Sequence, residues 1–436
     1  MAFQNSSLYN EAGVKTIVQH LSKDEAAVEF IRFRLYNKSW TDSIIYAAII
    51  LLSGKNNAMF IPLFEENELK KLMQFSNNSG EAAVNYLYPP AHRGTEVSNS
   101  LYKLIWQPLQ SLLDNINTVF YAPCGLLYKI SFAALHTNDN KLLIEKYDLK
   151  QLLCTRSLAL TAAEKTNVKT ASLWGGINYD ITFSSSVNSP GERNATDSFF
   201  IIPSYELNTF NKDHSPAAWQ PLPGTKTETE KILLLLKEKN IESELESGTA
   251  ASEEEFKKMD GASPALIHIA THGFVLPPTT TLKTNKEFLY ETNSFTAQQS
   301  PMFRSGLLLA GANAIWTGNR SKPDTDDGVL TAYEISQLDL SNTLLITLSA
   351  CETALGDIEE DNEGVYGLQR AFKMAGAKQI LMSLWKVPDA QTTQLMVLFY
   401  ASILQGNDEN TALRKAQLIM KEKYSPYYWA GFVLSE

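Results

Sequence analysis

The alternation of apolar and amphipathic segments in the second half of the chain restricts its fold most strongly. Short apolar segments there predict strands, and the longer amphipathic segments between them predict helices. The predicted strands are 241–245, 265–270, 306–310, 343–350 and 379–385, and the predicted helices are 225–239, a short one from 252, 330–338, 364–375, 390–404 and 411–421. Strands that are apolar on both faces are typical of a mainly parallel sheet flanked by helices. We therefore predict an α/β fold.

The first half of the chain carries a second group of predicted elements. Its strands are expected at 27–33, 43–52, 58–63, 117–122 and 171–176, and its helices at 65–74 and 98–113. Residues 177–223 are rich in Ser, Asn, Pro and Asp and predict a long irregular surface region. The turn-rich Tyr88-Pro89-Pro90 and the helix start near Gly224 divide the chain into a lead-in segment, 1–92, a middle segment, 93–223, and a C-terminal segment, 224–436. Two capping boxes, Thr225 to Glu228 and Ser252 to Glu255, mark expected helix starts.

Composition excludes several classes of protein. A content of 44% hydrophobic and 20% charged residues in 436 is that of a globular protein, and a net charge of −10 opposes a nucleic-acid-binding surface. Three cysteines predict neither a disulfide framework nor a Cys-rich zinc site. The N-terminus shows no signal peptide, and the apolar run 44–52 is too short to span a bilayer. We expect a cytoplasmic protein that needs no metal or cofactor and contacts neither membrane nor nucleic acid.

Two predicted strands end in reactive side chains. His272 follows the strand 265–270 and precedes Gly273, and Cys351 directly follows the strand 343–350. Because parallel strands bring such ends to one edge of a sheet, an imidazole and a thiol can meet there. The imidazole takes the thiol proton, the thiolate attacks a carbonyl, and the backbone N–H groups of Gly273 and Cys351 receive the charge on the oxygen.

A structural explanation competes for each of these residues. A cysteine at the end of an apolar strand is more often a small core residue than a nucleophile. We expect Cys124 and Cys154 to be core residues, because neither has a matching histidine at a strand end. His268 lies in the middle of its predicted strand, and we expect it to be an interior histidine rather than the base.

The segments around both residues resemble the CHAT family of caspase-like peptidases, which are often fused to tetratricopeptide repeats. The resemblance is carried by HIATHGF (268–274) and TLSACETALG (347–356), and it extends to YAPCGLLYKISFAAL (121–135), RSGLLLAGAN (304–313) and YYWAGFVL (427–434). It implies a caspase-like sheet with an N-terminal, pseudo-caspase-like lead-in and a cysteine endopeptidase activity. His272 and Cys351 would form the dyad, in the His-then-Cys order of caspases, separase, gingipains and legumain. Their separation, 351 − 272 = 79 residues, exceeds the roughly 50 of caspases.

The resemblance also bears on substrate preference. Cys351 is followed by Glu352 rather than by the remainder of the caspase signature, so aspartate specificity is not implied. The segment SLWKVPD (383–389) is similar to the separase segment in which an acidic residue lines a pocket for a basic side chain. Asp389 takes that position; alternatively, it is only the N-cap of the next helix. Trp385 is expected either in the wall of the substrate groove or in the core.

Regulation and partners follow from the same resemblance. Family members are proteases switched on by a partner, or by a ligand that an attached sensor domain detects. Bacterial examples act in defence, including gasdermin cleavage and CRISPR-linked proteolysis. The lead-in segment normally follows repeats, so we expect a portion of a longer protein or a member that lost its repeats. The acidic run 357–363 is expected to be an active-site loop or a solvated one. Two alternatives stay open, a non-catalytic scaffold for partner binding and a thiol hydrolase or acyltransferase acting on small esters.

Overall fold

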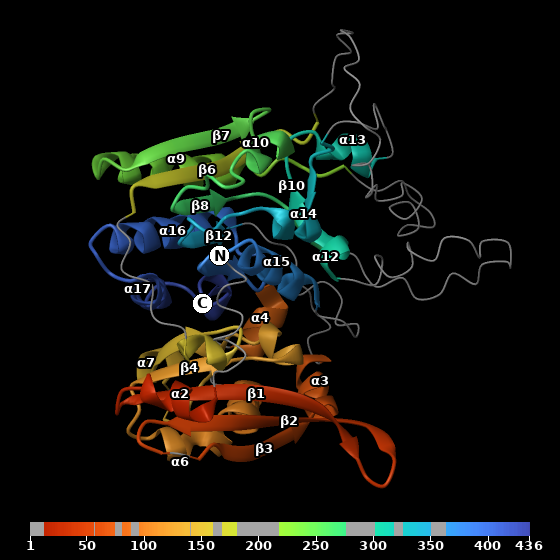
Figure 1. Cartoon of the computed structure of the whole chain (residues 1–436), viewed down its shortest axis with the longest axis vertical. Coiled ribbons are helices and arrows are strands. Elements are labelled where there is room, and N and C mark those ends of the chain that lie inside the picture. The colour runs from red at the N-terminus through yellow and green to blue at the C-terminus, as the bar shows by residue number, and fades with distance from the viewer. Residues whose placement is uncertain are drawn as a thin grey trace, which may run out of the picture.

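One mixed sheet of eleven strands extends through the molecule, with the strands in the order β3-β2-β1-β4-β5-β14-β13-β12-β8-β6-β7 (Figure 1). The computed structural model describes residues 13–55, 57–74, 81–88, 96–139, 141–159, 168–180, 218–275, 301–317, 326–349 and 363–436. Seven of the ten strand pairings are parallel, and the antiparallel ones are β1–β2, β2–β3 and β13–β14. The predicted α/β fold with a mainly parallel sheet and flanking helices is therefore confirmed.

The lead-in segment forms an antiparallel meander at one end of this sheet. Its strands are β1 (Glu25–Tyr36), β2 (Trp40–Leu52) and β3 (Met59–Glu65). Because side chains alternate along a strand, Val28 and Phe30 enter the main core, while Ala27 packs under α2 (Val14–Gln19) on the other face. The inner face is covered by helices α3 (Glu66–Gln74), α4 (Glu81–Leu87), α5 (Glu96–Ile105) and α6 (Gln110–Leu113).

The helix predicted over 98–113 is interrupted. The structure divides it into α5, a 3₁₀ turn at Gln107–Leu109 and α6. Pro108 explains the break, since its ring has no N–H to donate and clashes with the preceding turn of a helix. Helix α7 (Leu143–Lys146) and 3₁₀ turns at Gly125–Lys129, Phe132–Ala134, Thr155–Ala159 and Pro426–Tyr428 are further short elements.

Strand β14 (Phe432–Ser435) joins the two halves of the sheet and was not predicted. It lies between β5 (Asp148–Gln151), beside β4 (Thr118–Ala122), and β13 (Gln379–Ser383). It is parallel to β5 and antiparallel to β13. Consequently β4 and β5 run in one direction, and the strands from β13 to β7 run in the other.

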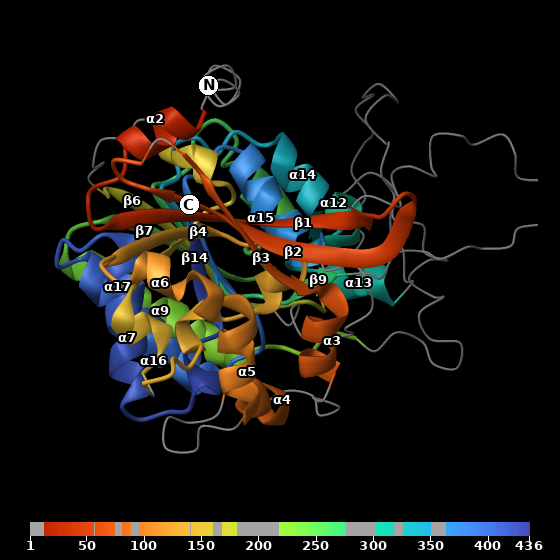
Figure 2. The same ribbon diagram turned by 90° about the horizontal axis from the view of Figure 1, so that it is seen from below.

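The C-terminal half supplies β12 (Leu345–Leu348), β8 (Leu266–Ile269), β6 (Thr170–Ile177) and β7 (Glu242–Gly248). Helices α9 (Pro223–Glu238) and α16 (Asp389–Ile403) lie together on one face of the sheet, with α17 (Glu409–Lys421) beside α16 against β5 and β14 (Figure 2). Helices α14 (Ala332–Gln337) and α15 (Glu363–Met374) pack on each other on the opposite side. Strand β8 is buried along its whole length, as expected for a strand covered on both faces.

A small antiparallel sheet stands beside the main one. It contains β9 (Gly273–Val275), β10 (Ser305–Leu308) and β11 (Val329–Thr331), and it adjoins α10 (Glu253–Lys257), α12 (Pro301–Arg304) and α13 (Ala312–Trp316). The strand predicted at 306–310 thus belongs to this sheet. The helix predicted from Leu330 begins only at Ala332, after β11.

One of the two predicted capping boxes is wrong. Ser252 accepts a hydrogen bond from the Glu255 N–H and caps α10, as expected. Helix α9, however, begins at Pro223, two residues before Thr225. The Thr225 hydroxyl donates to the Leu222 carbonyl and accepts from the Gly176 N–H, so it joins α9 to β6 instead of starting the helix.

None of the described helices is both long enough and apolar enough to cross a lipid bilayer. The proposed segments 1–92, 93–223 and 224–436 all contribute strands to the one large sheet. Their boundaries stay a prediction.

Candidate active site

The register of β8 and β12 sets the geometry of the site. The strands are parallel neighbours, and Ile269 at the end of β8 is paired with Leu348 at the end of β12. His272 comes three residues after Ile269 (272 − 269 = 3), and Cys351 comes three residues after Leu348 (351 − 348 = 3). His272 and Cys351 therefore follow paired strand ends by the same number of residues. Cys351 itself, like residues 350–362 around it, lies outside the described residues.

His272 is held between two aromatic rings. Its side chain is buried, with the ring of Trp219 at 4.8 Å and the ring of Tyr179 at 5.3 Å between centroids. Its Nε2 lies 2.8 Å from the carbonyl oxygen of Gln220. Because a carbonyl oxygen can only accept, Nε2 carries the proton, and Nδ1 is the basic nitrogen of the neutral ring. The arrangement fixes both the orientation and the tautomer of the His272 ring.

Asn313 secures the segment that carries Trp219 and Gln220. Its Oδ1 accepts from the Trp219 N–H at 2.7 Å, and its Nδ2 donates to the Trp219 carbonyl at 3.0 Å and to Asp180 at 2.6 Å. The side chain is buried, at the start of α13. Sequence reasoning did not single out Asn313, although it ends the block RSGLLLAGAN that carried part of the resemblance.

Gly273 opens β9 at the edge of the small sheet. The His272 carbonyl accepts from the Leu308 N–H at 2.9 Å, and β9 pairs with β10 alone. Since the N–H and C=O groups of successive strand residues point to alternate sides, the Gly273 N–H points away from β10. The role of this N–H as an oxyanion donor stays a prediction.

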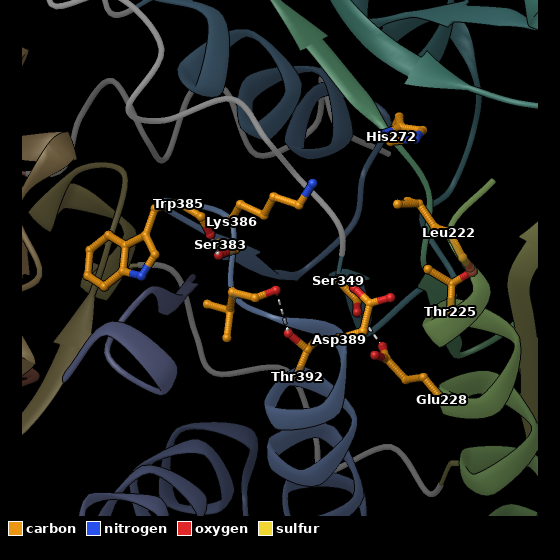
Figure 3. A pocket seen from close by; sticks show the side chains of 11 residues that line it. Leu222, Thr225, Glu228, His272, Ser349, Ser383, Trp385, Lys386, Asp389 and Thr392 are labelled. Carbon is orange, nitrogen blue, oxygen red and sulfur yellow. Dashed lines mark hydrogen bonds between the residues drawn. The ribbon is translucent and has the colours of Figure 1, made fainter. Parts of the chain in front are cut away.

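A pocket adjoins His272 and contains Asp389 (Figure 3). Asp389 is the first residue of α16, whose N-cap is Pro388, and its side chain makes no capping bond to its own helix. Its Oδ2 instead accepts from the Gly224 N–H, in the first turn of α9, at 3.1 Å. A Cβ on Gly224 would lie 2.2 Å from Asp389, so only glycine fits there. Asp389 therefore joins two helices and lines the pocket, and does not cap α16.

Trp385 and Lys386 form another side of this pocket. Trp385 is only 2% exposed; its Nε1 donates to the Tyr427 carbonyl at 2.8 Å and its ring stacks on Tyr88. It is thus a core residue with one surface at the pocket, which fits both expected roles. The Lys386 side chain is exposed and crosses the pocket in Figure 3.

His268 lies in the middle of β8 and is fully buried, which confirms the expectation of an interior histidine. Its Nε2 is 2.9 Å from Glu228 Oε1, and its Nδ1 is 3.1 Å from the Tyr400 hydroxyl. Ser349 also donates to Glu228 Oε1. Glu228 and Ser349 both line the pocket and were not predicted as site residues. The described part of the chain contains no group of three or more His, Cys, Asp or Glu side chains suited to a metal ion.

Two solved structures have a similar arrangement of elements. The Arg-specific cysteine proteinase gingipain R aligns with 85% of this chain and 74% of its own, at 10% identity and a TM-score of 0.41. The separase of Saccharomyces cerevisiae, in its complex with securin, aligns with 99% of this chain and 31% of its own, at 9% identity and a TM-score of 0.47. These likenesses concern the fold alone.

Sequence comparisons identify the family. Tetratricopeptide repeat protein 28 of Homo sapiens is 34% identical over 120 residues, which are 26% of this chain and 4% of that protein. The protein of the same name from Mus musculus is 35% identical over 115 residues, 26% of this chain and 5% of its own. The chain thus spans only a small fraction of the length of these relatives. A profile of the CHAT domain matches residues 95–436, and the chain belongs to the CHAT-domain family.

Proposed function

We propose that the protein is a cysteine endopeptidase in which His272 is the base and Cys351 the nucleophile. The observation that carries the proposal is the β8–β12 register, which gives the two residues equal offsets beyond paired strand ends. The hydrogen bond from His272 Nε2 to the Gln220 carbonyl supports it, because it leaves Nδ1 to accept a proton.

The reaction follows from these positions. His272 Nδ1 takes the thiol proton, and the Cys351 thiolate attacks the peptide carbonyl carbon. The Gly273 N–H, which points away from β10, and the N–H of Cys351 stabilise the oxyanion. When the C–N bond breaks, the imidazolium gives its proton to the leaving amine. Water then attacks the thioester with His272 again as the base, releasing the acid and restoring the thiol.

We further propose that the pocket beside His272 binds a basic side chain of the substrate. Asp389 supplies a carboxylate with only one hydrogen bond from the described residues, and a guanidinium or ammonium would complete its contacts. Lys386 lines the same pocket and would compete for the Asp389 carboxylate, so the Lys386 ammonium must move away when a basic substrate side chain binds.

The natural substrate of the peptidase would be a protein partner, a gasdermin-like effector being one candidate. Activation by repeats or a sensor partner, in a bacterial defence or signalling setting, completes the proposal.

The decisive test is substrate profiling on peptides from a proteome digest, comparing wild type with Cys351→Ala and His272→Ala. We expect cleavage by the wild type alone. Full cleavage by either variant would refute the dyad.

A thiol-reactive peptide probe separates the protease from the scaffold alternative. We expect the probe to label Cys351 in the wild type and to label it far less in His272→Ala. A chain that cleaves nothing and does not label at Cys351, even with an activating partner bound, would be a non-catalytic scaffold.

A further inference from the structure

A chain of hydrogen bonds runs through the interior beneath the pocket. It links four elements: Thr347 on β12 to Tyr400 on α16 (3.0 Å), Tyr400 to His268 on β8 (3.1 Å), and His268 to Glu228 on α9 (2.9 Å). Ser349 joins it by donating to the same Glu228 oxygen, Oε1. All five side chains are buried, and Glu228 is only 2% exposed.

The hydrogen bonds of this network have a direction. Glu228 Oε1 only accepts, so His268 Nε2 carries a proton and Nδ1 of the neutral ring accepts from the Tyr400 hydroxyl. The Tyr400 oxygen is then free to accept from Thr347. Burial raises the pKa of Tyr400 well above its usual value, and this hydroxyl stays protonated. The donors therefore converge on Glu228, which satisfies the carboxylate that burial would otherwise make costly.

Ser349 is fixed at two points. Its N–H donates to the Ile269 carbonyl of β8 at 3.0 Å, and its hydroxyl donates to Glu228 on α9. It is the first residue after β12 and stands two residues before Cys351. The end of β12 is thus tied both to the strand that leads to His272 and to the helix whose first turn contacts Asp389.

We propose that Glu228 and Ser349 form a clamp that positions the thiol of Cys351 relative to His272. Both are positioning residues, and Ser349 stands only two residues before Cys351 in the sequence. This inference rests on the proposed function, because it assigns the clamp to the same peptidase site. A buried carboxylate such as that of Glu228 stabilises a sheet less than an apolar side chain of similar size would. Its hydrogen bonds, however, have fixed directions and therefore define where the end of β12 lies.

The experiment measures the reactivity of Cys351 and needs no substrate. The pseudo-first-order rate of alkylation by iodoacetamide is followed on the Cys351 peptide by mass spectrometry, from pH 5 to 10, alongside the thermal midpoint. In Ser349→Ala, we expect about a three- to tenfold slower reaction at neutral pH, the size expected from losing one hydrogen bond. Ser263→Ala is the matched control: this serine is equally buried, at 6% exposure, and bonds Thr343 at the opposite end of β12.

Glu228→Gln tests the other half of the clamp, with the exposed Glu230→Gln on the same helix as its control. We expect Glu228→Gln to slow alkylation and Glu230→Gln to leave it unchanged. Because the two clamp residues share one hydrogen bond, the double variant should be less impaired than the sum of the single effects.

Two results would overturn the clamp. In the first, Ser349→Ala lowers the thermal midpoint as much as Ser263→Ala does but leaves the pH profile of Cys351 alkylation unchanged. In the second, the effects of Ser349→Ala and Glu228→Gln on the alkylation rate add fully in the double variant. Failure of the peptidase proposal looks different. In that case His272→Ala would leave the alkylation of Cys351 unchanged, and the clamp, which acts by placing the thiol beside His272, would be refuted with it. If only the clamp is wrong, His272→Ala slows alkylation and Ser349→Ala reacts at the wild-type rate.

Discussion

Two cysteines of this chain follow strands of the same sheet, and only one of these strands has a neighbour that leads to a histidine. Cys124 comes two residues after β4, in the N-terminal half, and Cys351 comes three residues after β12. Because β14 reverses the direction of the strands, the two thiols follow strand ends at opposite edges of the sheet. The charged side chains of Arg32, Glu29 and Glu66 lie around Cys124. Burial is the largest influence on the Cys124 thiol and raises its pKa to about 12.

The difference between these two cysteines lies in the neighbouring strand. Strand β4 is bordered by β1, with Glu29 opposite Ala122, and by β5, with Gln151 opposite Tyr121. Strand β12 is bordered by β8, which leads to His272 three residues beyond Ile269, the partner of Leu348. We therefore expect a strand end alone not to make a thiol reactive, and the adjacent strand to have to lead to a base as well.

The largest expected effect is the contrast in reactivity between these cysteines. At pH 7.5 we expect iodoacetamide to alkylate Cys351 about a hundredfold faster than Cys124, since a thiol of pKa about 12 is almost wholly protonated, even though its thiolate is intrinsically more nucleophilic. In guanidinium chloride the two rates should converge, because both environments are lost. Equal rates in the folded protein would break the comparison between the halves.

The substrate pocket gives the next largest effect. Asp389→Asn should lower kcat/KM for substrates with Arg or Lys at the cleavage site by about 10- to 100-fold, the value of one charge-assisted hydrogen bond. Substrates with apolar residues there should be cut as before, since Asn can still accept from the Gly224 N–H. Asp408→Asn is the control: Asp408 caps α17 through the Thr411 N–H. Loss of all substrates alike in Asp389→Asn would make this residue a structural link only.

A tryptophan from each half separates catalytic support from stability. Trp219→Leu removes a ring packed on His272, and we expect about a three- to tenfold fall in kcat with a small change in thermal midpoint. Trp106→Leu in the N-terminal core, where the ring is fully buried, should instead lower stability by about 2 to 4 kcal/mol with kcat unchanged. Cleavage assays measure kcat, and calorimetry measures stability. If both variants changed kcat and stability in the same way, Trp219 would have no separate role in supporting His272.

The sequence contained enough information for the fold class and for the position of His272 just after a buried strand, but less for the surroundings of this histidine. Strands such as 265–270 are apolar throughout, so their periodicity and length are unambiguous. Strand β14 was missed because Phe432–Ser435 is short and follows a 3₁₀ turn, with no pattern of its own. The segment becomes a strand only because its backbone pairs with β13 on one side and with β5 on the other.

The parts of the site that depend on distant contacts were beyond sequence reasoning. Glu228 matched a local capping box, and nothing local shows that the helix starts two residues before Thr225 and turns this carboxylate inward to His268. Asn313 acts through Trp219, 94 residues away in the sequence. Asp389 was identified through resemblance, but its contact with Gly224, 165 residues away, required the structure.

The smallest expected effect compares two buried carboxylates, Glu66 in the N-terminal half and Glu253 in the C-terminal half. Burial alone would raise the pKa of Glu66, but hydrogen bonds from Arg32 and Lys70 outweigh it and lower the pKa. For Glu253, burial and then the charges of Glu334 and Asp327 raise the pKa to about 8, despite the ion pair with Lys257.

These opposite shifts predict opposite pH dependences of stability. The contribution of Glu66 is present above the ordinary glutamate pKa and is lost as pH falls through its lowered value in the folded protein. Folded Glu253 binds its proton more tightly than the unfolded chain does, so stability falls as pH rises from about 4.5 to about 8. Glu253→Gln should therefore raise the thermal midpoint at pH 8 by about 1 to 3 °C and leave it nearly unchanged at pH 5, whereas Glu66→Gln should destabilise at pH 8 and have its smallest effect in acid. Scanning calorimetry at both pH values measures this, and parallel pH profiles for the two variants would show that the halves handle their buried charge alike.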